Sequence, residues 1–108
     1  MHKVFSVRDD KAMAFMQPFF CVTRGVAFRM FYAACIDSSH DFHKYAEDYA
    51  LYEIGEWDDT EPRLTQIDPP DLVVRAIDCI AAEKGSDNVR SMRADLEVGK
   101  EVEPERKL

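Results

Sequence analysis

The sequence predicts an α+β fold: a small antiparallel or mixed β-sheet with two helices packed on one face and a charged C-terminal tail. Three observations favour this class. Residues 3–8 alternate polar and apolar side chains with the period of a strand, and residues 50–57 form a second strand-like segment. Apolar residues between and after these segments recur at helical spacing. The resulting order of strand, strand, helix, hairpin and helix is typical of a sheet covered on one side.

Two short strands are predicted before the first helix. Residues 3–8 have the strand period of two, and the acidic pair at positions 9 and 10 is typical of a turn. Residues 19–22 (FFCV) are a run of apolar residues that favour strands. Residues 11–18 carry no clear pattern.

Two helices are predicted. Thr23 is a favourable N-cap, and helical spacing of apolar residues then predicts a helix over 24–36. Residues 38–48 are expected to form a loop with one helical turn. The second helix is expected to begin at residues 68–71 (DPPD), because Asp68 can cap and Pro69 suits the first helical position. Its apolar stripe would comprise Leu72, Val73, Ala76, Ile77 and Ile80, and Gly85 would end it.

A β-hairpin is predicted between these helices, from strands at 50–57 and 63–67 and a turn at 58–62. A glycine inside a strand, here Gly55, indicates a bulge or a close approach of another backbone. Strict alternation would separate two sets of side chains. One set is Leu51, Glu53, Gly55 and Trp57, and the other is Tyr52, Ile54 and Glu56.

Length and composition are those of one globular domain. With 108 residues, 46% of them hydrophobic, the chain fits one core, which we place at residues 1–85. Residues 86–108 are expected to be a charged extension, partly disordered or with one short helix. No apolar run predicts a transmembrane helix or a signal peptide, so we expect a cytoplasmic protein without membrane contact. Cys21, Cys35 and Cys79 lie in apolar segments and are expected to be buried free thiols.

The net charge of −7 is unevenly distributed along the chain. Residues 1–36 hold five basic and two acidic side chains, for a charge of +3. Residues 37–83 hold three basic and thirteen acidic side chains, for −10, and residues 84–108 balance. The overall sign argues against non-specific wrapping of nucleic acid, but the first third could still form a local basic face.

No pattern predicts an enzyme, a metal site or a cofactor site. The four glycines, at positions 25, 55, 85 and 99, match no phosphate-binding or dinucleotide-binding motif. His40 and His43 could place two imidazoles near carboxylates, but a second cluster of ligands is missing. Cys35 beside His40 lacks the exposed, electropositive setting that activates a thiol. We therefore expect no catalytic residue, no metal and no cofactor.

Two surfaces are candidates for binding. The first third interleaves basic and aromatic residues, as proteins that hold single-stranded nucleic acid do, although most of these phenylalanines could equally form the core. The predicted nucleic-acid site is Arg8, Lys11, Arg24 and Arg29, with Phe20 as a stacking residue.

The second candidate surface is the acidic hairpin. Five carboxylates there, Glu53, Glu56, Asp58, Asp59 and Glu61, are expected to lie in solvent, or else to steer a basic partner. The predicted partner-binding residues are Tyr52, Glu56, Trp57, Asp58 and Asp59, with the aromatic residues as anchors.

Two sequence blocks resemble a viral family. The first comprises residues 17–20 (QPFF) and 24–31 (RGVAFRMF), and the second is residues 47–59 (EDYALYEIGEWDD). Together, in this order and spacing, they resemble the small nonstructural protein of gokushovirus-type microviruses, which are phages with circular single-stranded DNA genomes. The resemblance covers residues 2–80 and does not extend to residues 86–108.

The resemblance implies a nonstructural accessory protein of the host cytoplasm that assists replication or packaging of a single-stranded genome. Such a protein would act by binding nucleic acid or the replication complex. The resemblance identifies no catalytic or binding residues in this chain. The alternative is a protein-interaction module whose acidic hairpin docks on a basic partner, such as the viral replication initiator or a capsid protein. Open sheet edges would also allow a homodimer.

Overall fold

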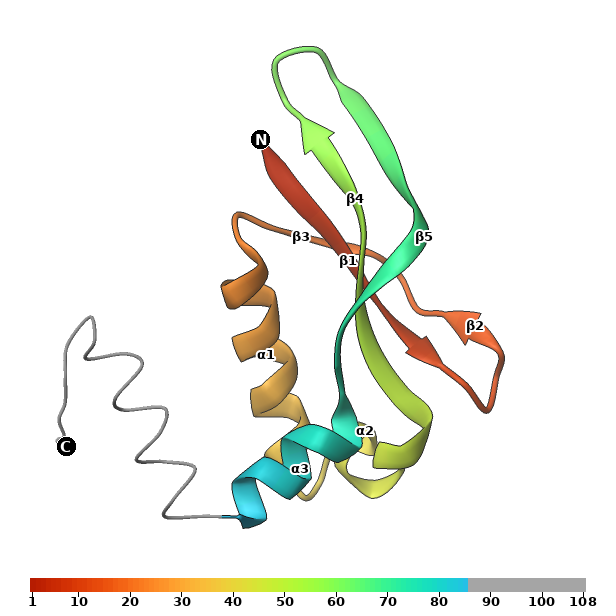
Figure 1. Ribbon diagram of the computed structural model, residues 1–108, viewed down its shortest axis with the longest axis vertical. Helices are drawn as coiled ribbons and strands as arrows, with labels where there is room; N and C mark the ends of the chain where they lie inside the picture. Colours follow the sequence, from red (N-terminus) through yellow and green to blue (C-terminus); the bar gives the residue numbers. More distant parts are fainter. Residues whose placement is uncertain (86–108) are drawn as a thin grey trace, which may run out of the picture.

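The computed structural model describes residues 1–85, which form one antiparallel sheet with helices packed against it (Figure 1). The strands are β1 (His2–Asp9), β2 (Ala14–Phe15), β3 (Phe19–Cys21), β4 (Tyr49–Asp58) and β5 (Arg63–Arg75). The helices are α1 (Arg24–Ile36), α2 (Asp41–Lys44), the 3-10 turn η1 (Ala46–Asp48) and α3 (Ala76–Lys84). The predicted α+β class is confirmed, and every strand pairing is antiparallel. The predicted C-terminal extension lies outside the described residues.

Strand β1 is central to the sheet. One edge of β1 pairs with β4, which in turn pairs with β5. The other edge of β1 pairs with both β2 and β3. Strand β3 lies against the start of β1, where Lys3 pairs with Cys21, and β2 lies against its end, where Arg8 pairs with Phe15. The sheet is curled, and the hairpin of β4 and β5 extends well beyond the helices (Figure 1). Strand β5 forms one outer edge.

The hydrophobic core lies between the sheet and the two longer helices. Helix α1 begins as predicted, because the Thr23 hydroxyl accepts a hydrogen bond from the backbone N–H of Val26 at 3.2 Å. Gly85 ends α3 as predicted, through a hydrogen bond from its backbone N–H to the Ala81 carbonyl. The helices bury Ala27, Phe31, Cys35, Ala76, Cys79 and Ile80 against Phe5, Val7 and Leu51 of the sheet. All three cysteines are buried and unpaired by disulfides, as predicted.

The prediction that a helix begins at residues 68–71 is wrong. Strand β5 continues to Arg75, the Asp68–Pro69 peptide bond is cis, and α3 begins only at Ala76. Beyond the proline pair the chain returns to β4, where Leu72 pairs with Tyr52. Cross-strand pairing and the two β-branched valines that follow outweigh the local capping signal. The proline pair is tolerated because β5 is an edge strand.

Strand β4 contains the irregularity that its glycine predicted. Val4 pairs with Gly55 and Phe5 with Glu53, so Ile54 is an extra residue and forms a bulge. A Cβ atom at Gly55 would lie 2.6 Å from the Thr65 carbonyl oxygen, so the close backbone approach is confirmed as well. The bulge shifts the alternation by one residue. The predicted grouping of Glu53 with Gly55 and Trp57 is therefore wrong, and they lie on opposite faces.

Candidate functional site

The register of the strands divides the sheet into two faces, because directly paired residues point to the same side. Phe5, Val7 and Leu51 point toward the helices, and we call their side the helix-covered face. The opposite side, which we call the helix-free face, carries fourteen paired residues. They are His2, Val4, Ser6, Arg8, Phe15, Phe20, Ala50, Tyr52, Gly55, Trp57, Leu64, Gln66, Leu72 and Arg75.

Negative charge is segregated to one of these two faces. Among the paired strand residues that the structure describes, the helix-free face carries two arginines and no carboxylate. The acidic strand residues with a partner all register on the helix-covered face: Asp9, Glu53, Glu56, Asp58 and Asp71. In a chain of net charge −7, this leaves one sheet face on which anionic ligands meet the least repulsion.

Four aromatic side chains form two pairs on the helix-free face. The rings of Phe15 and Tyr52 meet edge-on with centroids 5.4 Å apart, and those of Phe20 and Trp57 do so at 6.2 Å. Phe20 is 50% exposed. The sequence places Phe20 in a predicted nucleic-acid site and Trp57 in a rival partner site. The structure brings the two rings into contact, so the two predicted sites meet at this aromatic pair.

Two arginines lie at one end of the helix-free face. Arg8 and Arg75 are the cross-strand partners of Ala50 from its two sides. The Arg8 guanidinium carbon lies 5.4 Å from the centroid of the Phe15 ring, and its Nε donates to Asp10 in the following turn at 2.9 Å. An exposed ion pair of this kind contributes at most about 1 kcal/mol, so a phosphate could replace Asp10 at little cost.

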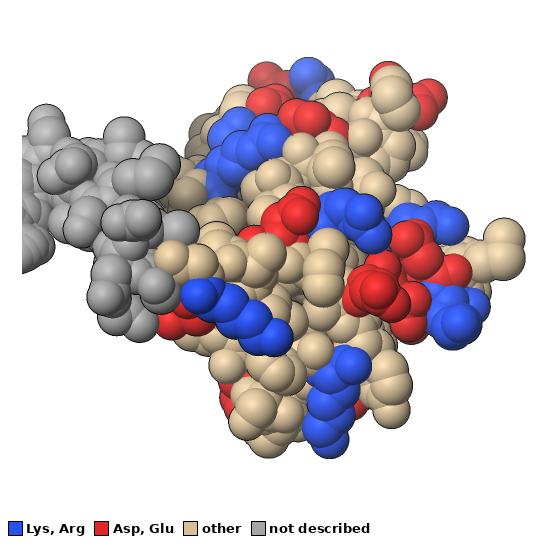
Figure 2. Space-filling model, turned by 60° about the horizontal axis from the view of Figure 1, so that its bottom comes forward, with Lys and Arg blue, Asp and Glu red and all other residues tan. Residues whose placement is uncertain are grey.

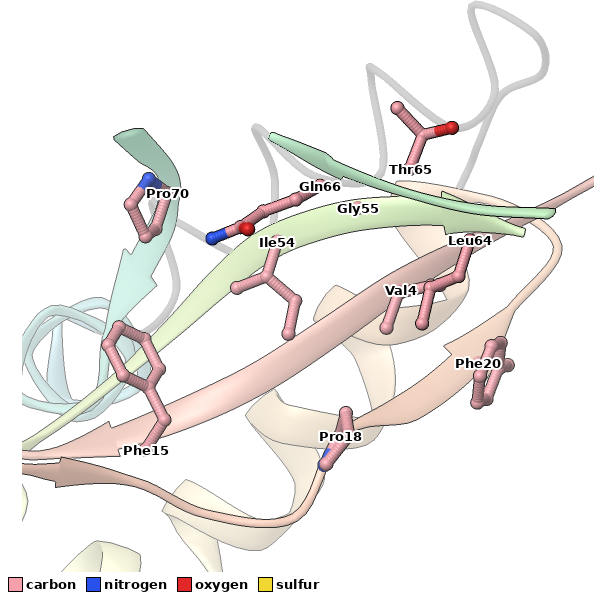
Figure 3. Close-up of a pocket in the computed structure, with 10 residues that line it drawn as sticks. All are labelled: Val4, Phe15, Pro18, Phe20, Ile54, Gly55, Leu64, Thr65, Gln66 and Pro70. Carbon is pink, nitrogen blue, oxygen red and sulfur yellow. The ribbon is translucent and has the colours of Figure 1, made fainter. Parts of the chain in front are cut away.

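A cavity of about 390 Å³ on this face is lined by one ring of each aromatic pair, Phe15 and Phe20 (Figure 3). Strand residues and Pro18 line it, and no helix residue does. Its walls include Val4, Phe15, Phe20, Ile54 and Leu64, which are apolar, and Gln66, which carries a polar amide. Apolar walls with few polar groups are typical of ligand pockets. The cavity is therefore the part of the helix-free face best suited to enclose a small group.

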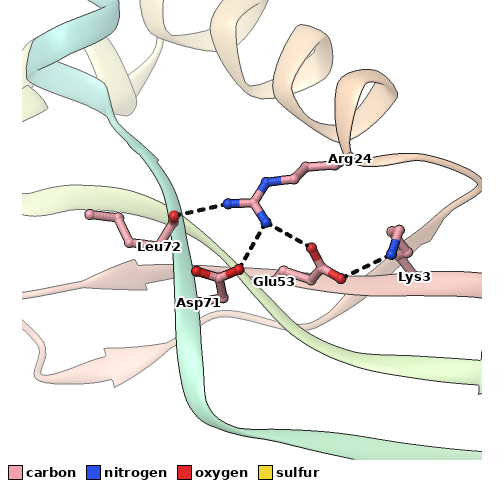
Figure 4. A network of polar contacts seen from close by, with 5 residues as sticks. All are labelled: Lys3, Arg24, Glu53, Asp71 and Leu72. Atoms are coloured by element: carbon pink, nitrogen blue, oxygen red, sulfur yellow. Dashed lines mark hydrogen bonds and ion pairs between the residues drawn. The ribbon is translucent and has the colours of Figure 1, made fainter.

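The predicted site residue Arg24 is engaged in a polar network on the helix-covered face (Figure 4). Its Nη1 contacts Glu53 at 3.2 Å and Asp71 at 2.9 Å, and its Nη2 donates to the Leu72 carbonyl at 3.1 Å. Lys3 holds the second oxygen of Glu53 at 3.3 Å. The hydrogen bond to Asp71 raises the pKa of Arg24, and the charges of both carboxylates add to this against the effect of burial.

This network corrects one prediction for the acidic hairpin. Glu53 was expected to lie in solvent with its acidic neighbours, but it is buried and only 6% exposed. The charge is tolerated because two cations hold its two oxygens. The network joins the first turn of α1 to β4 and β5. Arg24 therefore stabilises the packing of α1 on the sheet, and its guanidinium is poorly placed to meet a ligand.

The remaining predicted site residues are spread over the molecule. Lys11 lies in the turn after β1, and Arg29 is exposed on α1, away from Arg8 and Phe20. On the face of the molecule that Figure 2 shows, basic and acidic side chains are interspersed, and the visible described residues form no continuous basic patch. The predicted single basic face is thus divided. Arg8 and Phe20 share the helix-free face, whereas Arg24 and Arg29 belong to α1.

The predicted partner-binding residues are divided in a similar way. Tyr52 and Trp57 lie on the helix-free face, and Glu56 and Asp58 register on the other. The Asp58 carboxylate accepts hydrogen bonds from the backbone N–H and hydroxyl of Thr60, which lower its pKa. Asp59 lies 3.9 Å from the N-terminal amine. The aromatic anchors and the acids of this candidate site therefore do not form one surface.

The histidines that could have held a metal have local structural contacts. His40 accepts a hydrogen bond from the backbone N–H of Phe42 and so caps α2, and His43 contacts the Cys35 carbonyl at 2.9 Å. Within residues 1–85, no three side chains of the metal-binding types gather.

The thiol of Cys35, the other group weighed for chemistry, is not activated. A hydrogen bond with Cys79, together with burial, raises the pKa of Cys35, so this thiol is protonated at neutral pH.

Sequence reasoning missed the residues that complete the helix-free face. Arg75 and Gln66 have no predicted role, because residues 68–71 resemble a helix start and the strand register beyond them cannot be inferred locally. Phe15 is one aromatic residue among many in the first third of the chain.

None of the helices in residues 1–85 is long and apolar enough to cross a bilayer.

These features define a small α+β protein whose antiparallel sheet has helices on one face and exposed aromatic residues on the other. The chain belongs to the family described as Phage ORF5 protein, whose model matches residues 2–79. It is therefore a phage protein, which confirms the broader part of the resemblance stated above. Searches of curated proteins and of solved structures found no match.

Proposed function

We propose that this phage protein binds single-stranded DNA on the helix-free face of its sheet. The proposed role is to assist replication or packaging of a single-stranded genome, as the resemblance to the gokushovirus nonstructural protein implies. The observation that carries the proposal is the segregation of side chains across the sheet. Aromatic rings and arginines share one face, and the paired acidic strand residues are on the other.

Each group on this face suits one part of a nucleotide. Exposed aromatic rings offer stacking surfaces to bases, and base–aromatic stacking tolerates any sequence. Arg8 can hold a phosphate through charge-assisted hydrogen bonds, and so can the N–H groups of Arg75 other than the one on Nη2 that donates to the Glu47 carbonyl at 3.2 Å. An aromatic sheet surface bordered by cations is the arrangement that many proteins use to bind single strands. Duplex DNA, whose bases are stacked inside, would meet only the two arginines.

The test is fluorescence anisotropy with a labelled oligothymidylate over a salt titration, with duplex DNA of equal length as the comparison. We expect binding that weakens as salt increases and that prefers the single strand. The double variant Arg8→Gln/Arg75→Gln should lower the slope of log affinity against log salt by about 0.7 for each phosphate that the variant no longer neutralises. Phe20→Ala should weaken binding at every salt concentration, since stacking does not depend on counterions.

Two matched variants serve as controls. Arg63→Gln removes an exposed arginine of the helix-covered face that pairs with Glu61, and it should leave binding unchanged. Arg29→Gln tests the predicted contribution of the α1 cations, and we expect a small effect. If no DNA binds at low salt, or if Arg63→Gln weakens binding as much as Arg8→Gln, the proposal is wrong.

The second candidate is the protein-interaction module. The exposed acids at the end of the β4–β5 hairpin favour it, because the hairpin reaches beyond the helices and could meet a basic viral protein (Figure 1). The partner would be the replication initiator or a capsid protein. Reversing the charges with Asp58→Lys/Asp59→Lys should slow association with the purified partner at low salt. Unchanged association kinetics would contradict this candidate.

A further inference from the structure

We propose that the cavity of the helix-free face holds one unstacked nucleobase, whose edge is hydrogen-bonded by the side-chain amide of Gln66. This inference deepens the proposed function and rests on it. It assigns a ligand class to the cavity and a recognition role to a residue that the sequence did not single out.

The shape and walls of the cavity suit a flat heterocycle. Its volume of about 390 Å³ lies at the lower end of the range for small-molecule sites, which begins near 300 Å³. Val4 is almost fully buried beneath it, and Phe15, Phe20 and Leu64 border it (Figure 3). These apolar walls would replace the neighbouring bases that a nucleobase loses when it leaves the stack.

Gln66 gives the cavity its polar recognition group. Its side-chain amide has two donors and one acceptor oxygen, and it makes no hydrogen bond to another described residue. The other polar residue of the lining, Thr65, points its side chain to the opposite side of the sheet (Figure 3). A base edge also presents donors and acceptors, so it can satisfy this amide. Gln66 is exposed, so water satisfies its amide in the free protein, and a base edge can replace that water with hydrogen bonds that a purely apolar ligand cannot make.

The backbone places Gln66 accurately at the cavity. Gly55 allows β5 to approach β4 so closely that a Cβ atom there would collide with the Thr65 carbonyl. Gln66, the direct partner of Gly55, therefore lies in the same cross-strand row as Val4, with Gly55 between them, and its side chain lies beside Ile54 (Figure 3). Arg8 is four residues from Val4 along β1, about 13 Å at the rise of a strand. That separation lets Arg8 meet a phosphate of the same strand while a base occupies the cavity.

The test compares an oligothymidylate with an oligonucleotide of equal length that carries abasic sites throughout, both measured by anisotropy with the full chain. We expect the base-bearing strand to bind at least about fivefold more tightly, the lower limit for stacking of one base. Gln66→Leu should reduce that ratio without changing the salt slope, since it removes a hydrogen bond and no phosphate-binding group. Leu64→Trp, which fills the cavity from an exposed position, should also reduce the ratio, while bases can still stack on Tyr52 and Trp57, which lie outside the cavity lining.

Two substitutions are matched controls. Leu72→Trp adds the same ring at an exposed position of the same face and strand, outside the cavity, and should preserve the ratio. Thr65→Val changes the neighbour of Gln66 on the other face and should preserve it too. Equal binding of both strands would overturn the base site and leave DNA binding through phosphates intact. If neither strand binds, the proposed function itself fails.

A second copy of the chain is the rival occupant of the cavity. Sedimentation velocity of the wild type and of Leu64→Trp separates this case. If the wild type is a dimer that Leu64→Trp dissociates, while binding of both oligonucleotides is unchanged, the cavity is a contact between copies and the base site is overturned. A sedimentation coefficient that Leu64→Trp leaves unchanged, together with a reduced binding ratio, supports the base site.

Discussion

The two faces of the sheet carry the same kinds of side chain, aromatic rings and arginines, but they differ in how far these side chains are buried and paired. On the helix-covered face, Phe5 is fully buried, and Arg24 is bound to Glu53 and Asp71. On the helix-free face, Phe20 is half exposed, and the guanidinium of Arg8 rests on an exposed ring. One face uses its aromatic residues and cations to hold the fold together, and the other leaves them accessible.

This difference shows why residue type alone identifies a binding surface poorly. Among the basic and aromatic strand residues of the first third of the chain, three lie on each face: Arg8, Phe15 and Phe20 on the helix-free face, and Lys3, Phe5 and Phe19 on the helix-covered face. The face on which a residue lies is decided by strand register. Side chains alternate between the two faces along a strand, and this alternation shifts at each bulge. The following predictions, in order of expected effect, test whether stability depends on one face while the other is free for a ligand.

The largest expected effect is the contrast between two phenylalanines. Phe5→Ala empties a fully buried position and should lower the free energy of unfolding by about 3–5 kcal/mol. Phe20→Ala removes an exposed ring and should cost less than about 1 kcal/mol. Urea denaturation followed by circular dichroism measures both. Similar destabilisation of the two variants would mean that the helix-free face is part of the core.

The next effect concerns the buried carboxylate. Glu53→Gln removes the buried charge that holds Lys3 and Arg24 and should cost about 2 kcal/mol, less than for a fully buried ion pair because both cations are partly exposed. Asp71→Asn alters an exposed member of the same network and should cost less than about 1 kcal/mol. The same denaturation experiment compares them. If the two variants are equally destabilised, burial of Glu53 is not what makes the network important.

A pair of glycines gives a smaller effect with opposite signs. Gly55→Ala should destabilise by about 1–3 kcal/mol, because its Cβ would meet a backbone oxygen that cannot move freely. Gly25→Ala lies in the first turn of α1, where the nearest atom to a new Cβ is 3.9 Å away, and should stabilise by about 0.5 kcal/mol. Thermal denaturation shows the sign of each change. A neutral Gly55→Ala would contradict the close approach of β4 and β5.

The smallest effect is a dependence on pH at the end of α1. Hydrogen bonds from the Ser39 hydroxyl and backbone N–H lower the pKa of Asp37 in the folded protein. A carboxylate with a lowered pKa stabilises the fold above its unfolded pKa of about 3.9, and this contribution disappears as pH falls through the folded value. Asp37→Asn should thus be less stable than wild type at pH 7, with the difference decreasing as pH falls below the unfolded pKa. A difference that is constant with pH would contradict this assignment.

Local signals predicted those elements in which propensity and packing agree. The helix at 24–36 was correct to the residue, because Thr23 caps it and Ala27, Phe31 and Cys35 recur at helical spacing and face the core. Strands β1 and β4 were correct to within one or two residues. The segment 68–75 failed because its capping signal is local, whereas its pairing with β4 depends on residues about twenty positions earlier in the chain. The prediction for Glu53 failed because two cations from distant elements make its burial possible.

The sequence by itself determined the α+β class, the order of most elements, the buried thiols and the phage family, since composition, periodicity and motifs are local properties of the chain. Only the tertiary structure decided which aromatic residues and cations share a face. The Ile54 bulge separates Glu53 from Trp57, and the return of β5 places Arg75 across from Ala50, on the same face as Arg8. These placements follow from strand register, which is fixed by contacts between residues far apart in the sequence.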